Sequence, residues 1–285
     1  MPRSQRRKIS RSTVVISGAA SGIGRGLARR LSAHGCAVAL TDIDHKGLKE
    51  TEASLRGPAL ARTLDVADAA ALISFAAEVK EWMPSRLSAV FNNAGVATAG
   101  PVSEMLPEDH DWLMSINLGG VINGTRAFLP LLMAQDDGVI VNTSSVYGLL
   151  AVPFHSAYCA SKFAVRGYTD SLRQELRGTG VHAVTVHPGG IRTNIVRNAR
   201  FRTDPEGKGR TLAELAEEFD AMAMTTPDKA AEVIHKGVEA GKSRILVGPD
   251  AYFVDALARI APTRYFDVLT RVEARLQSRA GKDPR

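Results

Sequence analysis

A tyrosine and a lysine four residues apart, Tyr158 and Lys162, form a pair of side chains suited to moving a proton. They lie in a segment expected to be helical (157–179), where residues four apart project from one face. A phenol has a pKa of about 10, and bringing it near neutrality requires about 4 kcal/mol of anion stabilisation. One ammonium at about 4 Å supplies about that much at an effective dielectric constant of about 20. We therefore expect Tyr158 to exchange protons with an alcohol or carbonyl oxygen.

A serine lies close enough in sequence to assist this pair. Ser145 follows a predicted strand over 138–143 and precedes Tyr158 by 13 residues. Its hydroxyl could hydrogen-bond the substrate oxygen on which charge develops, although Ser144 is a competing choice. A tyrosine and a lysine on one helix are usually ordinary surface residues, so the assignment depends on motifs elsewhere in the chain.

A glycine-rich turn, SGAASGIG at 17–24, follows a predicted strand (13–17) and opens a predicted helix (23–34). Glycines allow a tight turn and a close approach of a pyrophosphate to the backbone. The helix start offers free N–H groups and a partial positive charge. A tight turn alone also needs glycine, but the strand–turn–helix context predicts dinucleotide binding. The expected contacts in this turn are Gly18, Ser21, Gly22, Ile23 and Gly24.

An acidic residue, Asp42, ends the second predicted strand (37–42), 18 residues beyond Gly24. This is roughly the separation expected for an acid that binds the adenosine ribose. A carboxylate there accepts hydrogen bonds from NAD, and each like-charge contact with the extra phosphate of NADP would cost about 4 kcal/mol. Ser21 and Ile43, where a basic residue could compensate, are neutral. We expect NAD rather than NADP; the alternative role of Asp42 is a turn or helix N-cap.

The strands and helices alternate along the whole chain. The strands are rich in Val, Ile, Leu and Ala with little polar alternation, as expected where helices cover both faces of a sheet. The pattern predicts an α/β fold, a single-domain doubly wound parallel sheet of the Rossmann-like type. Ligands of such sheets bind outside the carboxyl ends of the strands. Further motifs fall at such ends and are expected to form the floor of the adenine and ribose site: Asp65, Val66, Asn93, Ala94 and Gly95.

Taken in order, these motifs resemble those of the short-chain dehydrogenase/reductase family. The matching pieces are SGAASGIG, Asp42, Asp65-Val66, NNAG at 92–95, Asn117, Ser145, the YCASK segment with Tyr158 and Lys162, and Pro188-Gly189 with Thr193. Ser17 replaces the threonine usual in the family and keeps its hydroxyl.

The resemblance implies an NAD(P)-dependent oxidoreductase that acts on CH–OH groups. It favours Ser145 over Ser144, and it gives Asn117 the role of holding a water that relays protons to Lys162. It also implies that Pro188, Gly189 and Thr193 hold the nicotinamide end, with backbone groups near Ile191 contacting the carboxamide. The alternative is a non-catalytic NAD(P)-binding sensor or scaffold; its signature would be a lost tyrosine or lysine, and both are present.

The substrate side is expected to involve residues 194–227. This stretch begins basic and then becomes amphipathic, which predicts a lid over the nicotinamide; the alternative is a helix packed on the core. The segment 146–154 is apolar and predicts a hydrophobic pocket, hence a lipophilic alcohol or ketone. The apolar positions of the lid helix are Leu212, Leu215, Phe219 and Met222.

Length and charge complete the prediction. We expect a basic flexible tail (1–12), a catalytic domain (13–249) and a C-terminal helical extension (250–285) that serves subunit packing or covers the pocket. Peripheral membrane contact is an alternative for the extension. Five of the positive charges behind the net +6 lie in the tail, so we expect no nucleic-acid partner. No apolar run reaches the roughly 20 residues of a membrane span. The two cysteines lack metal-ligand spacing, and a cytoplasmic homo-oligomer, dimer or tetramer, is expected.

Overall fold

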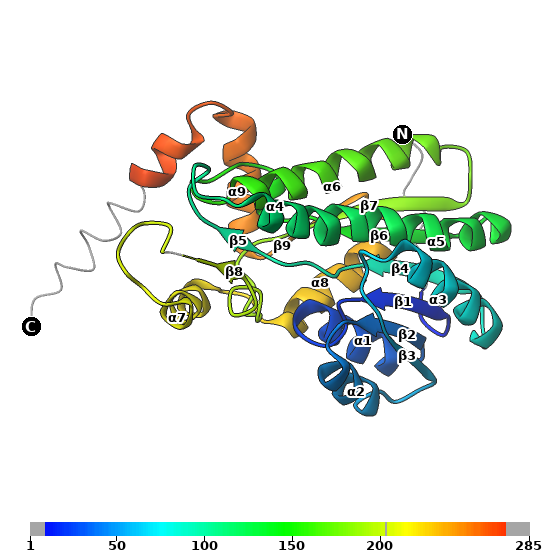
Figure 1. The fold of residues 1–285 in the computed structure, drawn as a ribbon. Coiled ribbons are helices and arrows are strands. Elements are labelled where there is room, and N and C mark those ends of the chain that lie inside the picture. The colour runs from blue at the N-terminus through cyan, green and yellow to red at the C-terminus, as the bar shows by residue number, and fades with distance from the viewer. Residues whose placement is uncertain (1–8, 203, 272–285) are drawn as a thin grey trace, which may run out of the picture.

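The computed structural model describes residues 9–202 and 204–271. A central sheet of seven parallel strands has the order β3-β2-β1-β4-β6-β7-β9 (Figure 1). The chain crosses between the two halves of the sheet after β3, so the carboxyl ends of β1 and β4 flank the switch point, where ligands of doubly wound sheets bind. The strands are β1 (Thr13–Ser17), β2 (Ala37–Asp42), β3 (Ala59–Thr63), β4 (Leu87–Asn92), β6 (Gly138–Thr143), β7 (Val181–Pro188) and β9 (Arg244–Val247).

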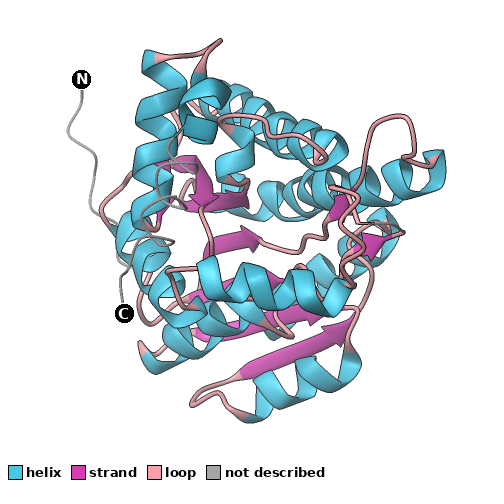
Figure 2. Cartoon of the chain, turned by 90° about the vertical axis from the view of Figure 1, so that its left-hand side faces the viewer, coloured by secondary structure: helices cyan, strands magenta, loops and turns pink. Residues whose placement is uncertain are grey.

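Helices cover both faces of the sheet, as Figure 2 shows, which confirms the predicted fold class. One apolar cluster joins the sheet to α1, α2 and α8 through side chains such as Leu27 and Ile234. The other joins it to α3, α5 and α6 through Phe75, Phe128 and Leu172. The flanking helices are α1 (Gly22–Ala33), α2 (His45–Ala53), α3 (Ala69–Trp82), α5 (Gly120–Gln135), α6 (Ser156–Glu175) and α8 (Pro227–Glu239).

The alternation of strands and helices along the sequence predicts one long helix over 107–133, but the structure interrupts this helix. α4 (Pro107–Met114) passes into a π-helical turn (Ser115–Gly119) before α5 begins. The turn contains Asn117, whose side chain bonds both backbone groups of Val96 on a distant loop. Single π turns inside helices are frequent at functional sites.

Smaller elements complete the chain. A short strand β5 (Thr98–Ala99) pairs in parallel with β8 (Arg200–Phe201), and neither was expected. α7 (Leu212–Met222) lies within the predicted lid, and α9 (Pro249–Ile260) follows β9. Ile9 is 1% exposed, so packed structure begins before β1.

Parts of the predicted tail (1–8) and of the C-terminal extension (272–285) lie outside the described residues. Within 9–202 and 204–271, no helix combines the length and apolar character that crossing a membrane would require.

Candidate active site

The glycine-rich turn is locked against the loop that follows β4. Gly18 and Gly22 adopt positive φ values of 66° and 51°, which glycine tolerates best. A Cβ on Gly24 would lie 2.0 Å from the carbonyl oxygen of Gly18, and one on Gly18 would lie 2.7 Å from the Cα of Ala94. Two motifs far apart in sequence therefore meet with no room for another methyl group.

The N-terminus of α1 carries donors suited to a pyrophosphate. Ser21 precedes the helix in an extended conformation, and its side chain makes no capping hydrogen bond. The first turn of α1 contains no acidic residue. The first N–H groups of any helix lack intrahelical partners and attract anions. The turn from Gly18 to Gly24, with Ile23 in the first helical turn, thus fits the phosphates of a dinucleotide.

Asp42 lies beside this turn at the end of β2. Its Oδ2 accepts the N–H of Ala20 at 2.9 Å, and its Oδ1 accepts the N–H of Asp44 at 3.0 Å. A carboxylate offers about four acceptor positions, so both oxygens retain capacity for ribose hydroxyls. Asp44, rather than Asp42, caps α2, and the alternative role of Asp42 as the N-cap is therefore not observed.

The remaining cofactor residues of the sequence prediction line the same edge of the sheet. The Asn93 side chain donates to the carbonyl oxygens of Ser17 and Gly18 at 3.2 and 3.4 Å. The Ser17 hydroxyl accepts the N–H groups of Asn93 and Ala94 at 3.0 and 3.2 Å. Serine therefore provides the hydroxyl group at the position where threonine is usual in the family. Asp65 is exposed and accepts the N–H of Ala67, whereas Val66 is buried.

Tyr158 and Lys162 lie together on α6, close to the carboxyl end of β6. The Nζ of Lys162 is 5.5 Å from the centre of the Tyr158 ring and donates to the carbonyl oxygen of Thr143 at 3.2 Å. The Ser145 side chain lies close enough to the Tyr158 hydroxyl to lower the pKa of the phenol. Lys162 is 3% exposed, so its ammonium is held in a site with little water.

The electrostatics of this pair differ from the prediction. Burial raises the pKa of Tyr158 above its usual value, although the nearby Ser145 side chain acts in the opposite direction. Burial also lowers the pKa of Lys162 to about 8. Desolvation is thus the largest influence on the pKa of Tyr158 in the protein alone, and the phenol keeps its proton near neutral pH.

The geometry distinguishes the two adjacent serines. The Ser144 hydroxyl is buried and donates to the carbonyl oxygen of Lys162 at 2.7 Å, so it holds α6 against the loop. The Ser145 hydroxyl accepts the N–H of Tyr147 at 3.1 Å and lies near the Tyr158 hydroxyl, whose pKa it lowers. Ser145 is thus the serine that faces the tyrosine.

Asn117 is fully buried in the π turn beside the lysine. Its Oδ1 accepts the N–H of Val96 at 2.8 Å, and its Nδ2 donates to the Val96 carbonyl and the Ser161 hydroxyl at 3.0 and 3.1 Å. A Cβ on Gly95 would lie 3.2 Å from Asn117 Oδ1 and 3.3 Å from Lys162 Nζ. Gly95 therefore lies against both residues.

The turn after β7 lies next to the glycine-rich turn. The methyl group of Thr193 would be 3.0 Å from a Cβ on Gly22. Ile191 is buried and forms a β-bridge with Thr225. Pro188 ends β7, and the N–H of Gly189 donates to Val247 in β9 at 2.9 Å. All the predicted nicotinamide-end residues are thus held at one edge of the sheet.

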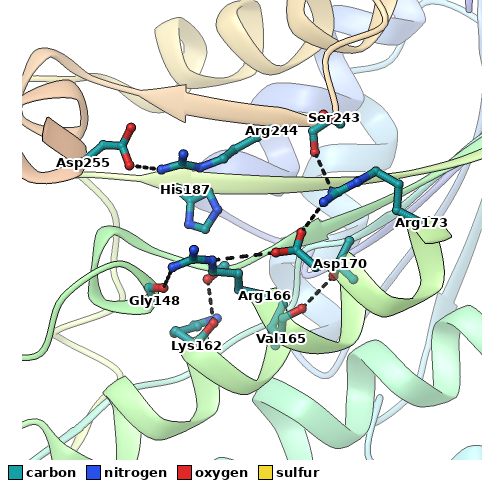
Figure 3. A network of polar contacts seen from close by, with 12 residues as sticks. Gly148, Lys162, Val165, Arg166, Asp170, Arg173, His187, Ser243, Arg244 and Asp255 are labelled. Carbon is teal, nitrogen blue, oxygen red and sulfur yellow. Dashed lines mark hydrogen bonds and ion pairs between the residues drawn. The ribbon is translucent and has the colours of Figure 1, made fainter. Parts of the chain in front are cut away.

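No sequence motif points to His187, which lies on β7 near Arg166 and Arg244 (Figure 3). It is 0% exposed, and its Nδ1 lies 3.0 Å from the carbonyl oxygen of Ser145. Burial lowers the pKa of His187 to about 4, so the ring is neutral near pH 7 and Nδ1 carries the donated hydrogen. Arg166 donates to the carbonyl of Gly148 at 3.3 Å on the same loop.

Arginine–carboxylate pairs hold much of the segment expected to be a lid. Arg200 and Arg202 contact Asp109 of α4 at 3.3 and 2.7 Å, and the Arg200 guanidinium lies 4.0 Å from the centre of the Trp112 ring. Within the segment, Arg210 contacts Asp204 at 2.9 Å.

The apolar residues near the catalytic pair are only partly accessible. Val146, Leu149 and Leu150 are at most 8% exposed and belong to the protein interior. Phe154 is 37% exposed, and Val152 is half-buried. On α7, Leu212, Leu215 and Phe219 are half-buried, whereas Met222 is 72% exposed.

Comparison with known proteins points in one direction. The family model of short chain dehydrogenases matches residues 12–203. SadH of Mycobacterium tuberculosis, named as an oxidoreductase, is 42% identical over 257 residues, covering 88% of this chain and 91% of SadH. A short-chain dehydrogenase/reductase from Burkholderia phymatum in complex with NAD has a TM-score of 0.80 and 26% identity, covering 95% of this chain and 97% of that one. A serine dehydrogenase complexed with NADP+ has a TM-score of 0.74 and 26% identity, covering 84% and 95%.

Proposed function

The chain belongs to the short-chain dehydrogenase family and is an NAD(P)-dependent oxidoreductase, and from this premise we propose that it interconverts an alcohol and a ketone or aldehyde. The observation that carries the proposal is the contact of Tyr158 with both Ser145 and Lys162 beside the glycine-rich turn. A non-catalytic sensor has no need of this constellation.

In this proposal the catalytic residues act on the substrate oxygen. Tyr158 donates its proton to a carbonyl during reduction and removes a proton from an alcohol during oxidation. Ser145 hydrogen-bonds the same oxygen, and Asn117 holds a water that connects Lys162 to solvent. When bound, the dinucleotide supplies the hydride donor or acceptor and, in its oxidised form, a positive charge.

The raised pKa of Tyr158 explains why the positive charge of the oxidised dinucleotide matters for the reaction. In the protein alone the phenol keeps its proton, which is the form that reduction requires. Oxidation requires the phenolate, and the Lys162 ammonium supports it only below the lysine pKa of about 8. A second positive charge next to the phenol therefore favours proton release when an alcohol is to be oxidised.

Cofactor preference is proposed to be for NAD. In this proposal Asp42 binds the adenosine ribose at the side that carries the extra phosphate of NADP, and charge repulsion opposes that phosphate. The nearest arginine on α1, Arg25, bonds the Ala20 and Gly47 carbonyl oxygens and pairs with Glu50 at 3.2 Å. Its guanidinium is therefore committed to holding α2 against the turn.

The substrate and setting complete the proposal. The accessible apolar side chains of Phe154, Val152 and Met222 favour a lipophilic alcohol or ketone. We place the enzyme in the cytoplasm as a dimer or tetramer, with the exposed apolar residues Tyr252 and Phe253 of α9 available for subunit packing.

Replacement of the tyrosine tests the reaction. We expect Tyr158→Phe to bind NADH as the wild type does and to lose turnover by about a thousandfold, because only the proton donor is removed. Turnover is followed at the reduced-nicotinamide absorbance with a panel of lipophilic alcohols and ketones. Activity close to that of the wild type in the variant would refute the assigned role. Binding of NADH by wild type without turnover of any panel member favours the sensor instead.

Replacement of the aspartate tests the cofactor. We expect the wild type to have a higher kcat/KM with NAD than with NADP, and Asp42→Ala combined with Ile43→Arg to reverse the order, because the carboxylate is replaced by a guanidinium. Asp44→Ala is the control, since this carboxylate caps α2. A wild type that prefers NADP would contradict the proposed preference.

A further inference from the structure

A carboxylate from the C-terminal part of the chain is packed into the turn after β7. Asp250 is the second residue of α9, and its Oδ2 accepts the N–H of Gly190 at 2.6 Å. A Cβ on Gly189 would lie 2.1 Å from this oxygen, and one on Gly248 would lie 2.4 Å from Oδ1. The backbone therefore touches the carboxylate from two directions, and both neighbouring positions need glycine.

The second oxygen of this carboxylate, Oδ1, lowers the stability of the fold. Oδ1 of Asp250 is buried and has no hydrogen-bond partner within the described part of the chain. A buried acceptor left unpaired destabilises a fold, and a charged one does so more strongly. The contact that positions this carboxylate is therefore the one between Oδ2 and the N–H of Gly190 in the turn.

Backbone hydrogen bonds and the Arg192 side chain, which donates to the Ala223 carbonyl oxygen at 3.0 Å, also hold that turn. Gly189 donates to Val247, Thr225 donates to Gly190 at 3.3 Å, and Arg192 donates to Thr225 at 3.0 Å. These bonds fix the chain on either side of the peptide between Gly189 and Gly190. Among residues 9–202 and 204–271, the group that bonds the N–H of that peptide is Asp250, so its side chain sets the orientation of the peptide group.

We propose that Asp250 is a positioning residue for the nicotinamide end of the cofactor, and this inference rests on the proposed function, in which residues 188–193 hold the nicotinamide. Asp250 fixes the Gly190 peptide and, with it, the backbone of Ile191 that is expected to meet the carboxamide. α9 is thereby part of the cofactor site, although it follows the last strand of the sheet.

Two ligands distinguish binding at the nicotinamide end of the cofactor site from binding at its adenine end. NADH carries the nicotinamide, whereas ADP-ribose carries the adenine, ribose and pyrophosphate without it. We expect Asp250→Ala to raise the Kd of NADH about tenfold, the size of one lost charge-assisted hydrogen bond, with the Kd of ADP-ribose unchanged within about twofold. Asp250→Asn retains an acceptor for Gly190 and should restore most of the NADH affinity.

Asp255→Ala is the matched control on the same helix. This carboxylate pairs with Arg244 and Arg259 and is not bonded to the turn. We expect it to leave the ratio of the two dissociation constants unchanged, even if it lowers the melting temperature.

If Asp250→Ala does not fold, Gly189→Ala provides the second test, because its methyl group must displace the carboxylate. It should weaken NADH selectively in the same way. If the ratio of the two dissociation constants does not change, even where both ligands bind more weakly by the same factor, the positioning role is overturned. Because these are binding measurements, their outcome is distinct from a failure of turnover in the wild type, which would instead refute the proposed function.

Discussion

The glycine-rich turn and the segment 194–227 face the same edge of the sheet but are held by different forces. Around the turn, contacts are buried and close, so that a Cβ on Gly24 would lie 2.0 Å from a carbonyl oxygen. The segment is attached in part through arginines such as Arg200 and Arg202, whose side chains are 45% and 57% exposed. Buried close packing tolerates almost no change, whereas exposed ion pairs contribute little individually and are screened by salt.

The difference assigns separate tasks to the two regions. A cofactor is the same molecule in every catalytic cycle, so a rigid turn binds it without reorganisation. A surface segment held by weak pairs can adjust its position at low cost in free energy. We therefore expect changes in the turn to affect cofactor binding and stability, and changes in the segment to affect the KM of the substrate.

The largest effect is expected from Gly24→Ala. Its methyl group would collide with the Gly18 carbonyl and lie 2.8 Å from the Asn93 side chain. We expect a loss of about 1–3 kcal/mol in the free energy of unfolding, together with a severe loss of NADH binding. Thermal unfolding and an NADH fluorescence titration measure the two effects.

Gly167→Ala on α6 is the matched control, because a Cβ there meets nothing within 4 Å. It should be neutral or stabilise the protein by up to about 1 kcal/mol, since alanine favours a helix. If Gly24→Ala and Gly167→Ala had the same effect on thermal unfolding and on NADH binding, the contrast between buried and exposed positions would be contradicted.

The sequence was informative where local rules decide the structure. The helical period alone places Tyr158 and Lys162 on one face, and the strand–turn–helix pattern alone places the glycines at the N-terminus of α1. The seven-stranded sheet likewise follows from the alternation of buried strands and amphipathic helices.

The features that the sequence could not predict depend on distant contacts. The π turn at Asn117 coincides with hydrogen bonds to Val96, and the positions of His187 and Asp250 become informative only when β7, β9 and α9 are adjacent. The pKa of Tyr158 depends on how deeply its ring is buried, which no local pattern gives. β5 and β8 are too short to show any periodicity.

An effect of intermediate size is expected from the buried residue His187, which makes the stability of the fold depend on pH. The folded pKa of His187 is about 4, because burial and the nearby Arg244 and Arg166 oppose protonation more than the Ser145 carbonyl and Asp170 favour it. The unfolded pKa is about 6.5, so the unfolded chain binds more protons between these values and stability falls as pH decreases from about 6.5 to 4. At pH 5 the contribution is about 2 kcal/mol at most.

His187→Asn removes this titration and retains a donor for the Ser145 carbonyl. We expect its melting temperature to depend less on pH than that of the wild type between about pH 6.5 and 4. Other groups titrate in both proteins, so the difference between the two curves is the quantity to compare. Parallel curves would show that the pKa of His187 is the same in the folded and the unfolded chain, and hence that burial does not lower it.

The smallest effect is expected from Arg202→Gln. The arginine contacts Asp109 at 2.7 Å, but its own side chain is 57% exposed, and Arg200 remains to pair with the carboxylate. We expect the KM of the substrate to change by less than about threefold, and the difference from wild type to shrink as salt is raised from about 0.05 to 0.5 M.

Arg210→Gln is the control within the same segment, because that guanidinium is 17% exposed and its partner Asp204 only 2%. Being less accessible to ions, the Arg210 pair should give a larger effect with a weaker salt dependence. If Arg202→Gln instead lowered NADH affinity as strongly as Gly24→Ala does, the segment would belong to the rigid cofactor site, and the division between a fixed turn and an adjustable surface segment would fail.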